Sequence, residues 1–104
     1  MKVLLDHCLD WRLGRSIVGH DVKCAGKLRW GHLKDPDMLT KAQGQFDLLV
    51  TSDKNLPFQQ NLARFKIAVV ILDVPSNRLE DCLPKIPLLL ARMHSLRKGR
   101  ALVI

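Results

Sequence analysis

Two short apolar runs, each followed by an acidic residue, constrain the fold of this chain most strongly. Val3-Leu4-Leu5 is followed by Asp6, and Leu48-Leu49-Val50-Thr51 is followed within two residues by Asp53. Continuous apolar runs of this length are typical of strands that are buried on both faces, as in parallel sheets. An acid at the carboxyl end of such a strand points into the crevice where open α/β sheets bind ligands. The pattern therefore predicts a parallel sheet with a polar site at its carboxyl edge.

The rest of the chain alternates between helix and strand signals. Strands are expected at residues 2–5, around 21–24, and at 46–51, 67–72 and 101–104. A first helix is expected from an N-cap at Asp10 to Gly19, and a second from Asp35-Pro36 to Gly44. One or two helical turns are expected over 59–64. The last helical region is expected from a cap at Ser76 or Asn77 to Leu96, with a break near Leu83. Residues 27–34 and 54–58 are expected to form loops. This alternation predicts one α/β domain over residues 1–104, with three α/β/α layers around a mostly parallel sheet of about five strands.

The charge balance favours a polyanionic partner. The chain of 104 residues has 17 Lys and Arg against 10 Asp and Glu, a net charge of +7. Binding of basic residues to RNA phosphates releases counterions, which drives association. The excess gathers in two clusters, which are Lys23, Lys27, Arg29 and Lys34, and Arg92, Arg97, Lys98 and Arg100.

No segment indicates a membrane. The apolar runs are far shorter than the roughly 20 residues that a membrane span needs. The N-terminal apolar run ends at once in Asp6 and does not have the pattern of a signal peptide. We therefore expect a cytoplasmic protein with no membrane partner.

Three carboxylates are candidate metal ligands: Asp6 and Asp53 after strands, and Asp35 at the start of a helix. An acid that follows a buried strand needs compensation, and hard cations prefer such oxygen ligands. Each acid also has a purely structural alternative, since capping explains Asp6 and Asp35, and an Asx-turn explains Asp53. Asp73 follows another apolar run and is an outer candidate for the same group. Clustered carboxylates raise one another's pKa, so a bound divalent ion is the simplest explanation if they converge.

Other kinds of site are less well supported by the residues. The cysteines Cys8, Cys24 and Cys82 form no CxxC pair, which favours a reducing compartment. A zinc site built from His7, Cys8, His20 and Cys24 is an alternative, although its ligand pairs lack the usual spacing. The chain has neither a glycine-rich nucleotide-binding loop nor a nucleophilic serine motif.

Two segments carry a resemblance to the second half of PIN-domain nucleases, in which an Asp opens a helix and Thr-x-Asp follows the next strand. They read Asp35-Pro36-Asp37-Met38-Leu39-Thr40-Lys41-Ala42 and Asp47-Leu48-Leu49-Val50-Thr51-Ser52-Asp53-Lys54-Asn55. With Val3-Leu4-Leu5-Asp6 at the N-terminus, nearly the whole chain resembles the short PIN-like proteins of prokaryotes. Many of those proteins are thought to be the toxins of toxin-antitoxin pairs.

The resemblance implies Mg²⁺- or Mn²⁺-dependent hydrolysis of RNA. Its metal ligands would be Asp6, Asp35 and Asp53, with Thr51 supporting the loop and Asn55 as a further catalytic contact. The RNA would be held by Lys54, Gln59 and Gln60, and Asn61 is a further candidate for contacting sugar or bases. A small antitoxin protein is the implied protein partner.

The chain departs from the fuller PIN pattern, and this leaves alternatives. The helix after the first strand lacks the Glu that often completes the acidic set, and His7 stands where short relatives are frequently acidic. A non-catalytic module that binds nucleic acid or protein is therefore the first alternative. Asp53-Lys54-Asn55-Leu56-Pro57 also resembles the phosphoacceptor region of response-regulator receivers, but the paired acids and the late Lys-Pro pair of receivers are missing.

A homodimer is also expected. The run Leu88-Leu89-Leu90 exceeds what one helix face can bury, so apolar surface is left to be covered.

Overall fold

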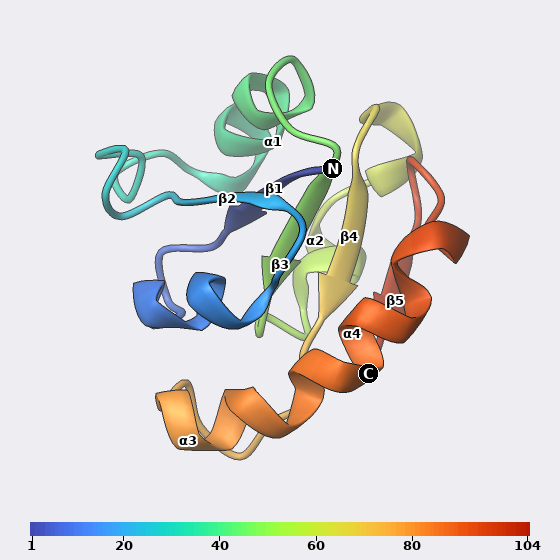
Figure 1. Cartoon of the computed structure of the whole chain (residues 1–104). Coiled ribbons are helices and arrows are strands. Elements are labelled where there is room, and N and C mark those ends of the chain that lie inside the picture. Colours follow the sequence, from blue (N-terminus) through green and yellow to red (C-terminus); the bar gives the residue numbers. More distant parts are fainter.

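The apolar runs form a five-stranded sheet in the computed structural model, which describes residues 1–104 (Figure 1). The strands are β1 (Lys2–Leu5), β2 (Asp21–Cys24), β3 (Leu48–Thr51), β4 (Ala68–Ile71) and β5 (Ala101–Val103). Their order across the sheet is β2-β1-β3-β4-β5, and every neighbouring pair is parallel. The predicted α/β class and mostly parallel sheet of about five strands are confirmed.

Short helices connect the strands. They are η1 (Trp11–Ser16), α1 (Asp35–Gln43), α2 (Leu56–Gln59), η2 (Leu62–Arg64), α3 (Leu79–Cys82), η3 (Leu83–Lys85), α4 (Ile86–Arg92) and η4 (Met93–Ser95), where η denotes a 3-10 helix. None of them combines the length and the apolar character needed to cross a membrane.

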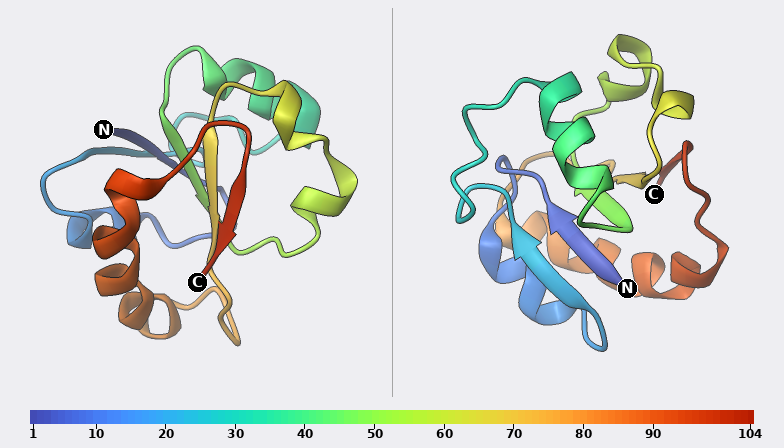
Figure 2. Two further views of the ribbon diagram at one scale, coloured as in Figure 1. Left: turned by 90° about the vertical axis from the view of Figure 1, so that its right-hand side faces the viewer. Right: turned by 90° about the horizontal axis from the view of Figure 1, so that it is seen from above.

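The sheet separates two hydrophobic cores, as the alternation of side chains along β1 illustrates. Val3 and Leu5 point into one core, which η1, α3 and α4 cover, and Leu4 points into the other, which α1, α2 and η2 cover. Figure 2 shows α1 and α2 on one side of the sheet and η1 and α4 on the opposite side. Both cores bury their central residues completely, so β1 and β3 lack a solvent-exposed face. The expected three-layer α/β/α arrangement follows from this double burial.

Several helix boundaries differ from the expectation. The segment expected as a loop over 54–58 contains the start of α2, because Pro57 lies in the first turn, where its missing N–H costs nothing. Asp35 is the first helical residue of α1 and Lys34 is the N-cap, so Asp35 is not a cap. The expected caps Ser76 and Asn77 are also wrong, since Arg78 is the N-cap of α3.

Other boundary predictions are confirmed. The side chain of Asp10 caps η1 by accepting a hydrogen bond of 2.9 Å from the backbone N–H of Arg12, although the helix is 3-10 and not α. The last helical region breaks at Leu83, where α3 gives way to η3 and then to α4. The chain then turns at Gly99, whose φ of 78° favours glycine, and enters β5.

The edge strand β2 packs closely against η1. A side chain at Gly14 would place its Cβ 3.0 Å from Cγ1 of Val22, which is tighter than an ordinary van der Waals contact. Glycine therefore allows η1 to approach β2, and this brings the exposed residues of η1 next to the open edge of the sheet.

Candidate functional site

The strand order places the switch point of the sheet between β1 and β3. The region outside the carboxyl ends of these two strands is here called the β1–β3 crevice, although none of the cavities of the protein is lined by Asp6, Asp35 or Asp53. The chain leaves β1 toward β2 on one side and leaves β3 toward β4 on the other, so the order reverses between these two adjacent strands. Open α/β sheets bind ligands at such a switch point, outside the carboxyl ends of the strands. Asp6 follows β1, and Thr51, Ser52 and Asp53 end β3. The sequence prediction that these residues share one edge of the sheet is confirmed.

Asp6 is held by hydrogen bonds on both carboxylate oxygens. Its Oδ2 accepts a bond of 2.7 Å from Oγ1 of Thr51. Its Oδ1 accepts a bond of 2.8 Å from the backbone N–H of His7 and lies 3.0 Å from Nδ1 of the His7 ring. The residue is only 9% exposed, and its backbone N–H donates to the carbonyl of Val50 at 2.9 Å. The position of this carboxylate is therefore fixed by the fold.

Thr51 connects Asp6 to Asp53. Its fully buried hydroxyl donates to Asp6 and also accepts a bond of 3.1 Å from the backbone N–H of Asp53. Oδ1 of Asp53 accepts from the backbone N–H of Asn55 at 3.0 Å, which is the Asx-turn that the sequence allowed. Thr51 thus has the supporting position expected of it, and the backbone of Asn55 shapes the turn.

Asp35 approaches the same region from the start of α1. Partial burial raises the pKa of the Asp35 carboxyl, and the negative charges of Asp53 and Asp6 raise it further, whereas His7 opposes the shift. Like charges disfavour the ionised form of a carboxyl group. The charges of Asp6 and Asp53 therefore act on Asp35, although the three acids do not lie close enough together to form one metal-binding group.

The acids are not arranged as a closed metal cage. No three His, Cys, Asp or Glu side chains of the protein lie close enough together to hold one metal ion. The same finding shows that His7, Cys8, His20 and Cys24 do not assemble a zinc site. Nδ1 of His7 lies 3.0 Å from Oδ1 of Asp6, and Asp6, Thr51 and Asp53 offer carboxylate and hydroxyl oxygens. Such oxygens suit a hydrated Mg²⁺ or Mn²⁺ ion, which binds through one or two carboxylates and keeps several waters.

Asp73 has a different role from the other acids. Its carboxylate forms an exposed ion pair with Nζ of Lys54, and this contact lowers the pKa of Asp73. The pair bridges the end of β4 to the turn after β3, so Asp73 is compensated without a metal. Lys54 is correspondingly engaged by Asp73, and its predicted contact with RNA stays a prediction.

Residues next to the acids include some that the sequence did not indicate. The hydroxyl of Ser52 lies 3.4 Å from Sγ of Cys8 and donates a hydrogen bond to Oδ1 of Asn77, which joins the turns after β1, β3 and β4. Phe58, on α2 directly after the Asp53 turn, is 88% exposed. Gln59 is exposed beside it and Gln60 is half-buried. In the sequence, the only indication that Phe58 belongs to the site was its position as an apolar residue among polar neighbours.

The fold and the site define an α/β domain with acidic side chains at the switch point of a parallel sheet. Compared with models of protein families, with curated proteins and with solved structures, the chain matches none of them. The likeness to PIN-domain nucleases therefore depends on the residues quoted for it, and an assignment of activity depends on the chemistry of the crevice.

Proposed function

We propose that this protein is a divalent-metal-dependent ribonuclease that hydrolyses phosphodiester bonds of RNA at the β1–β3 crevice. The observation that carries the proposal is the placement of Asp6 and Asp53 at the switch point of the sheet, where the Thr51 hydroxyl is hydrogen-bonded to both residues. The raised pKa of Asp35 supports it. Three neighbouring carboxylates repel one another, and a cation between them relieves that repulsion. A crevice that favours a cation, in a chain with a net charge of +7, suits an enzyme that acts on a polyanion.

Asp6 and Asp53 are the side chains that would hold Mg²⁺ or Mn²⁺, with Asp35 contacting its bound waters. A bound ion supplies a polarised phosphoryl oxygen and an activated water for phosphodiester hydrolysis. Thr51 keeps the Asp6 carboxylate in place through its 2.7 Å hydrogen bond and orients the Asp53 turn through its second bond. These bonds fix the negative oxygens before any ligand arrives, so little reorganisation is needed on binding.

The surroundings of the acids suit an extended RNA strand. Asn55, Gln59 and the ring of Phe58 are exposed directly after Asp53 and would meet sugar and bases, with Gln60 at the edge of that contact. Lys54 would exchange its ion pair with Asp73 for a phosphate. We propose that the protein acts in the cytoplasm as the toxin of a toxin-antitoxin pair. Its partner would be a small antitoxin protein. Leu88, which is 52% exposed on α4, is the centre of the proposed homodimer contact.

Incubation of the pure protein with RNA and Mg²⁺ or Mn²⁺ tests the proposal. Wild-type protein should cleave the RNA, and EDTA should stop it. Asp6→Asn and Asp53→Asn should lose the activity, whereas Glu80→Gln should keep it. Glu80 is the control because it is an exposed acid on α3 that lines none of the cavities of the protein. Equal cleavage by wild type and both crevice variants would show that the RNA loss comes from a contaminant.

A non-catalytic binding module is the second candidate, and one observation favours it: no three ligands converge on a single metal position. Such a module would bind RNA or protein with equal affinity in Mg²⁺ and in EDTA, and it would leave RNA intact. Asp6→Asn would then change binding only slightly.

The strand order favours a third candidate, a receiver-like phosphoacceptor domain. The order β2-β1-β3-β4-β5 is that of flavodoxin-like folds, and Asp53 follows the central strand β3. Such a domain would acquire an acyl phosphate on Asp53 from a small phosphodonor. Intact mass measurement of wild type and Asp53→Asn after such treatment separates this candidate from the nuclease.

A further inference from the structure

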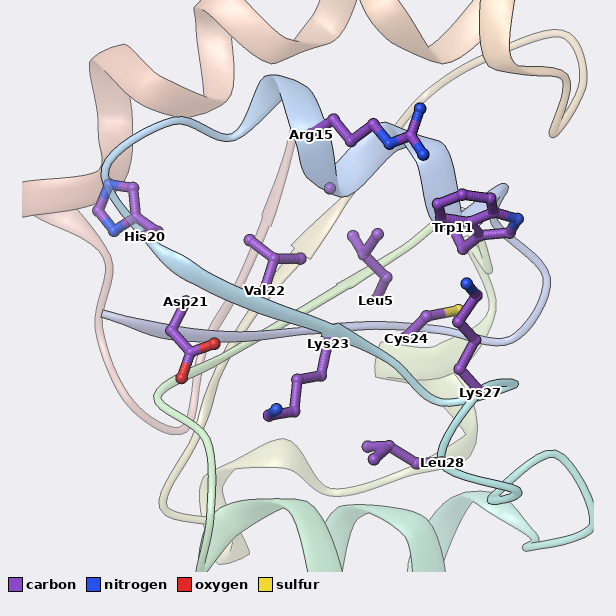
Figure 3. A pocket seen from close by; sticks show the side chains of 11 residues that line it. Leu5, Trp11, Arg15, His20, Asp21, Val22, Lys23, Cys24, Lys27 and Leu28 are labelled. Atoms are coloured by element: carbon purple, nitrogen blue, oxygen red, sulfur yellow. The ribbon is translucent and has the colours of Figure 1, made fainter.

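Two adjoining cavities lie between His7 and the edge of the sheet. The first, of about 520 Å³, starts at His7, whose ring contacts Asp6, and is lined by Asp10, Trp11, Arg12 and Lys27 among others. The second, of about 570 Å³, extends around the edge strand β2 next to η1 (Figure 3). Both cavities are lined by Trp11, Cys24 and Lys27. Together they are here called the β2-edge channel.

Trp11 organises the cations of the β2-edge channel. Cζ of Arg15 lies 4.6 Å from the centroid of the Trp11 ring, and Nζ of Lys27 lies 3.6 Å from it. Figure 3 shows the indole between the ends of these two side chains. A ring attracts a cation through its quadrupole and does not neutralise it, so both groups keep their full charge. Trp11 itself is 42% exposed, and its site is therefore open to solvent.

The charge of this channel is uncompensated at three positions. Arg15, Lys27 and Lys23, which lies on the edge strand β2, have no carboxylate oxygen within 4.0 Å. Arg12 differs, because Asp10 binds its guanidinium at 2.7 Å. The remaining acid of the channel is Asp21, at the end farthest along β2 from Trp11. Three free cations against one acid leave the channel positive.

The channel also has an apolar lining. Val22 and Cys24 line the second cavity on the η1 face of β2, and Leu28 lines it together with Lys23 on the opposite face. A single-stranded polynucleotide matches both features, because its phosphates bind cations while its unpaired bases cover apolar surface. A duplex keeps its bases stacked inside and presents only phosphates, so it would leave the apolar lining uncovered.

We propose that the β2-edge channel binds the backbone of a single-stranded nucleic acid, whose phosphates contact Arg15 and Lys27 beside Trp11 and reach Lys23 around the edge of β2. The proposal rests on the proposed function in one respect: it takes the bound strand to continue into the crevice at Asp6 as the strand to be cleaved. The channel thereby gives the enzyme a preference for unpaired RNA.

The channel proposal is tested by measuring how RNA binding to the wild-type protein depends on salt. EDTA is present throughout, because the test does not require cleavage. A labelled RNA of about 12 unpaired nucleotides is titrated by anisotropy between about 50 and 200 mM salt. Each phosphate contact on a single strand contributes about −0.7 to the slope of log K against log salt, so Arg15→Gln, Lys23→Gln and Lys27→Gln should each reduce the slope by about that amount. Lys66→Gln, an exposed lysine outside the channel, should leave the slope unchanged.

Trp11 gives a second readout. RNA should change the fluorescence of Trp11, and the other tryptophan, Trp30, is only 7% exposed and should contribute little. Trp11→Leu should weaken binding about fivefold or more, and Trp11→Phe should restore part of it because a ring remains for the cations. Single-stranded DNA of the same sequence should bind comparably, since the contacts are to phosphates.

Three results would overturn the proposal: unchanged salt slopes in all three channel variants, duplex RNA bound as tightly as the single strand, or polyglutamate of equal charge competing as well as RNA. The last result would indicate an acidic protein as the partner. Absence of RNA cleavage together with the expected salt slopes would reject the nuclease and keep the channel. RNA cleavage that depends on Asp6, together with unchanged salt slopes, would support the nuclease and reject the channel.

Discussion

Asp6 and Asp35 lie at the same edge of the sheet but are held in different ways. Asp6 is 9% exposed and accepts hydrogen bonds from Thr51 and His7 on its two oxygens. Asp35 stands at the start of α1 with its carboxyl pKa raised by partial burial and by its acidic neighbours. The fold thus gives the Asp6 carboxylate hydrogen-bond donors, whereas partial burial and nearby acids disfavour the charged form of Asp35. Under the proposed function, Asp6 would be a preformed part of the site, whereas Asp35 would gain a partner only when a cation binds.

The largest expected contrast between the two acids is in RNA cleavage. Asp6→Asn should reduce the rate at least about a hundredfold, because loss of even the outer partners of metal ligands costs about 10- to 100-fold. Asp35→Asn should reduce it less, since its carboxylate would contact the ion through water. Initial rates at saturating Mg²⁺ measure both. A loss for Asp35→Asn that equals or exceeds the loss for Asp6→Asn would reverse the assignment of the two roles.

Thr51→Val tests how far the position of Asp6 depends on its hydrogen bond. The change removes a fully buried hydroxyl and leaves a buried carboxylate oxygen without its donor, so the free energy of unfolding should fall by about 1–3 kcal/mol. Chemical denaturation measures this value. Thr40→Val is the matched control, because the Thr40 hydroxyl is exposed and bonds only to the carbonyl of Pro36 in its own helix. A similar loss in both variants would indicate that Asp6 does not need Thr51.

Asp35→Asn should stabilise the protein at neutral pH. The raised pKa means that the folded state binds the Asp35 proton more tightly than the unfolded state does, so ionisation of this group opposes folding above its ordinary pKa of about 4. The variant should therefore have a higher melting temperature than wild type at pH 7, and the difference should vanish below about pH 4. Asp37→Asn, in the same helical turn but exposed, controls for the loss of a favourable charge at a helix start.

The smallest expected effect is at Asp10, whose charge has its own partner. Hydrogen bonds from the side chain and backbone of Arg12 lower the pKa of Asp10 to about 2. Its contribution to stability is present above the ordinary Asp value and is lost as the pH falls toward 2. Asp10→Asn keeps a good N-cap, so it should lower the melting temperature slightly at pH 6 and not at all near pH 2. A large effect at pH 6 would show that the ion pair with Arg12 does more than cap η1.

Local sequence patterns were sufficient for the sheet. Val3-Leu4-Leu5 and Ala68-Val69-Val70-Ile71 could be assigned to buried strands because a continuous apolar run admits few other placements. The short helix α2 was not recognised, since four residues containing a proline have almost no periodic signal. The caps of α1 and α3 were misplaced by one or two residues, because Asp, Ser and Asn near a helix start can bond to the backbone from several positions.

The candidate site was predictable only where it follows strand ends. Asp6 and Asp53 could be brought together because parallel strands have their carboxyl ends at one edge. The β2-edge channel could not, because it joins Trp11 and Arg15 of η1 to Lys27 beyond β2, and the approach of these segments depends on the packing at Gly14. The basic cluster predicted from the sequence contains Lys23 and Lys27 of the channel together with Arg29 and Lys34, but not Trp11 or Arg15.

The all-parallel sheet also determines when the site comes into existence during folding. A chain without a β-hairpin cannot form any strand pair locally, and sheets made of distant pairings form slowly. The hydrogen bond between Asp6 and Thr51 joins residues 45 positions apart, across the central β1–β3 pair. The carboxylates are therefore brought together only once the middle of the sheet has closed. A nascent or partly folded chain consequently has no assembled site, so the proposed cleavage of RNA would require a complete central sheet.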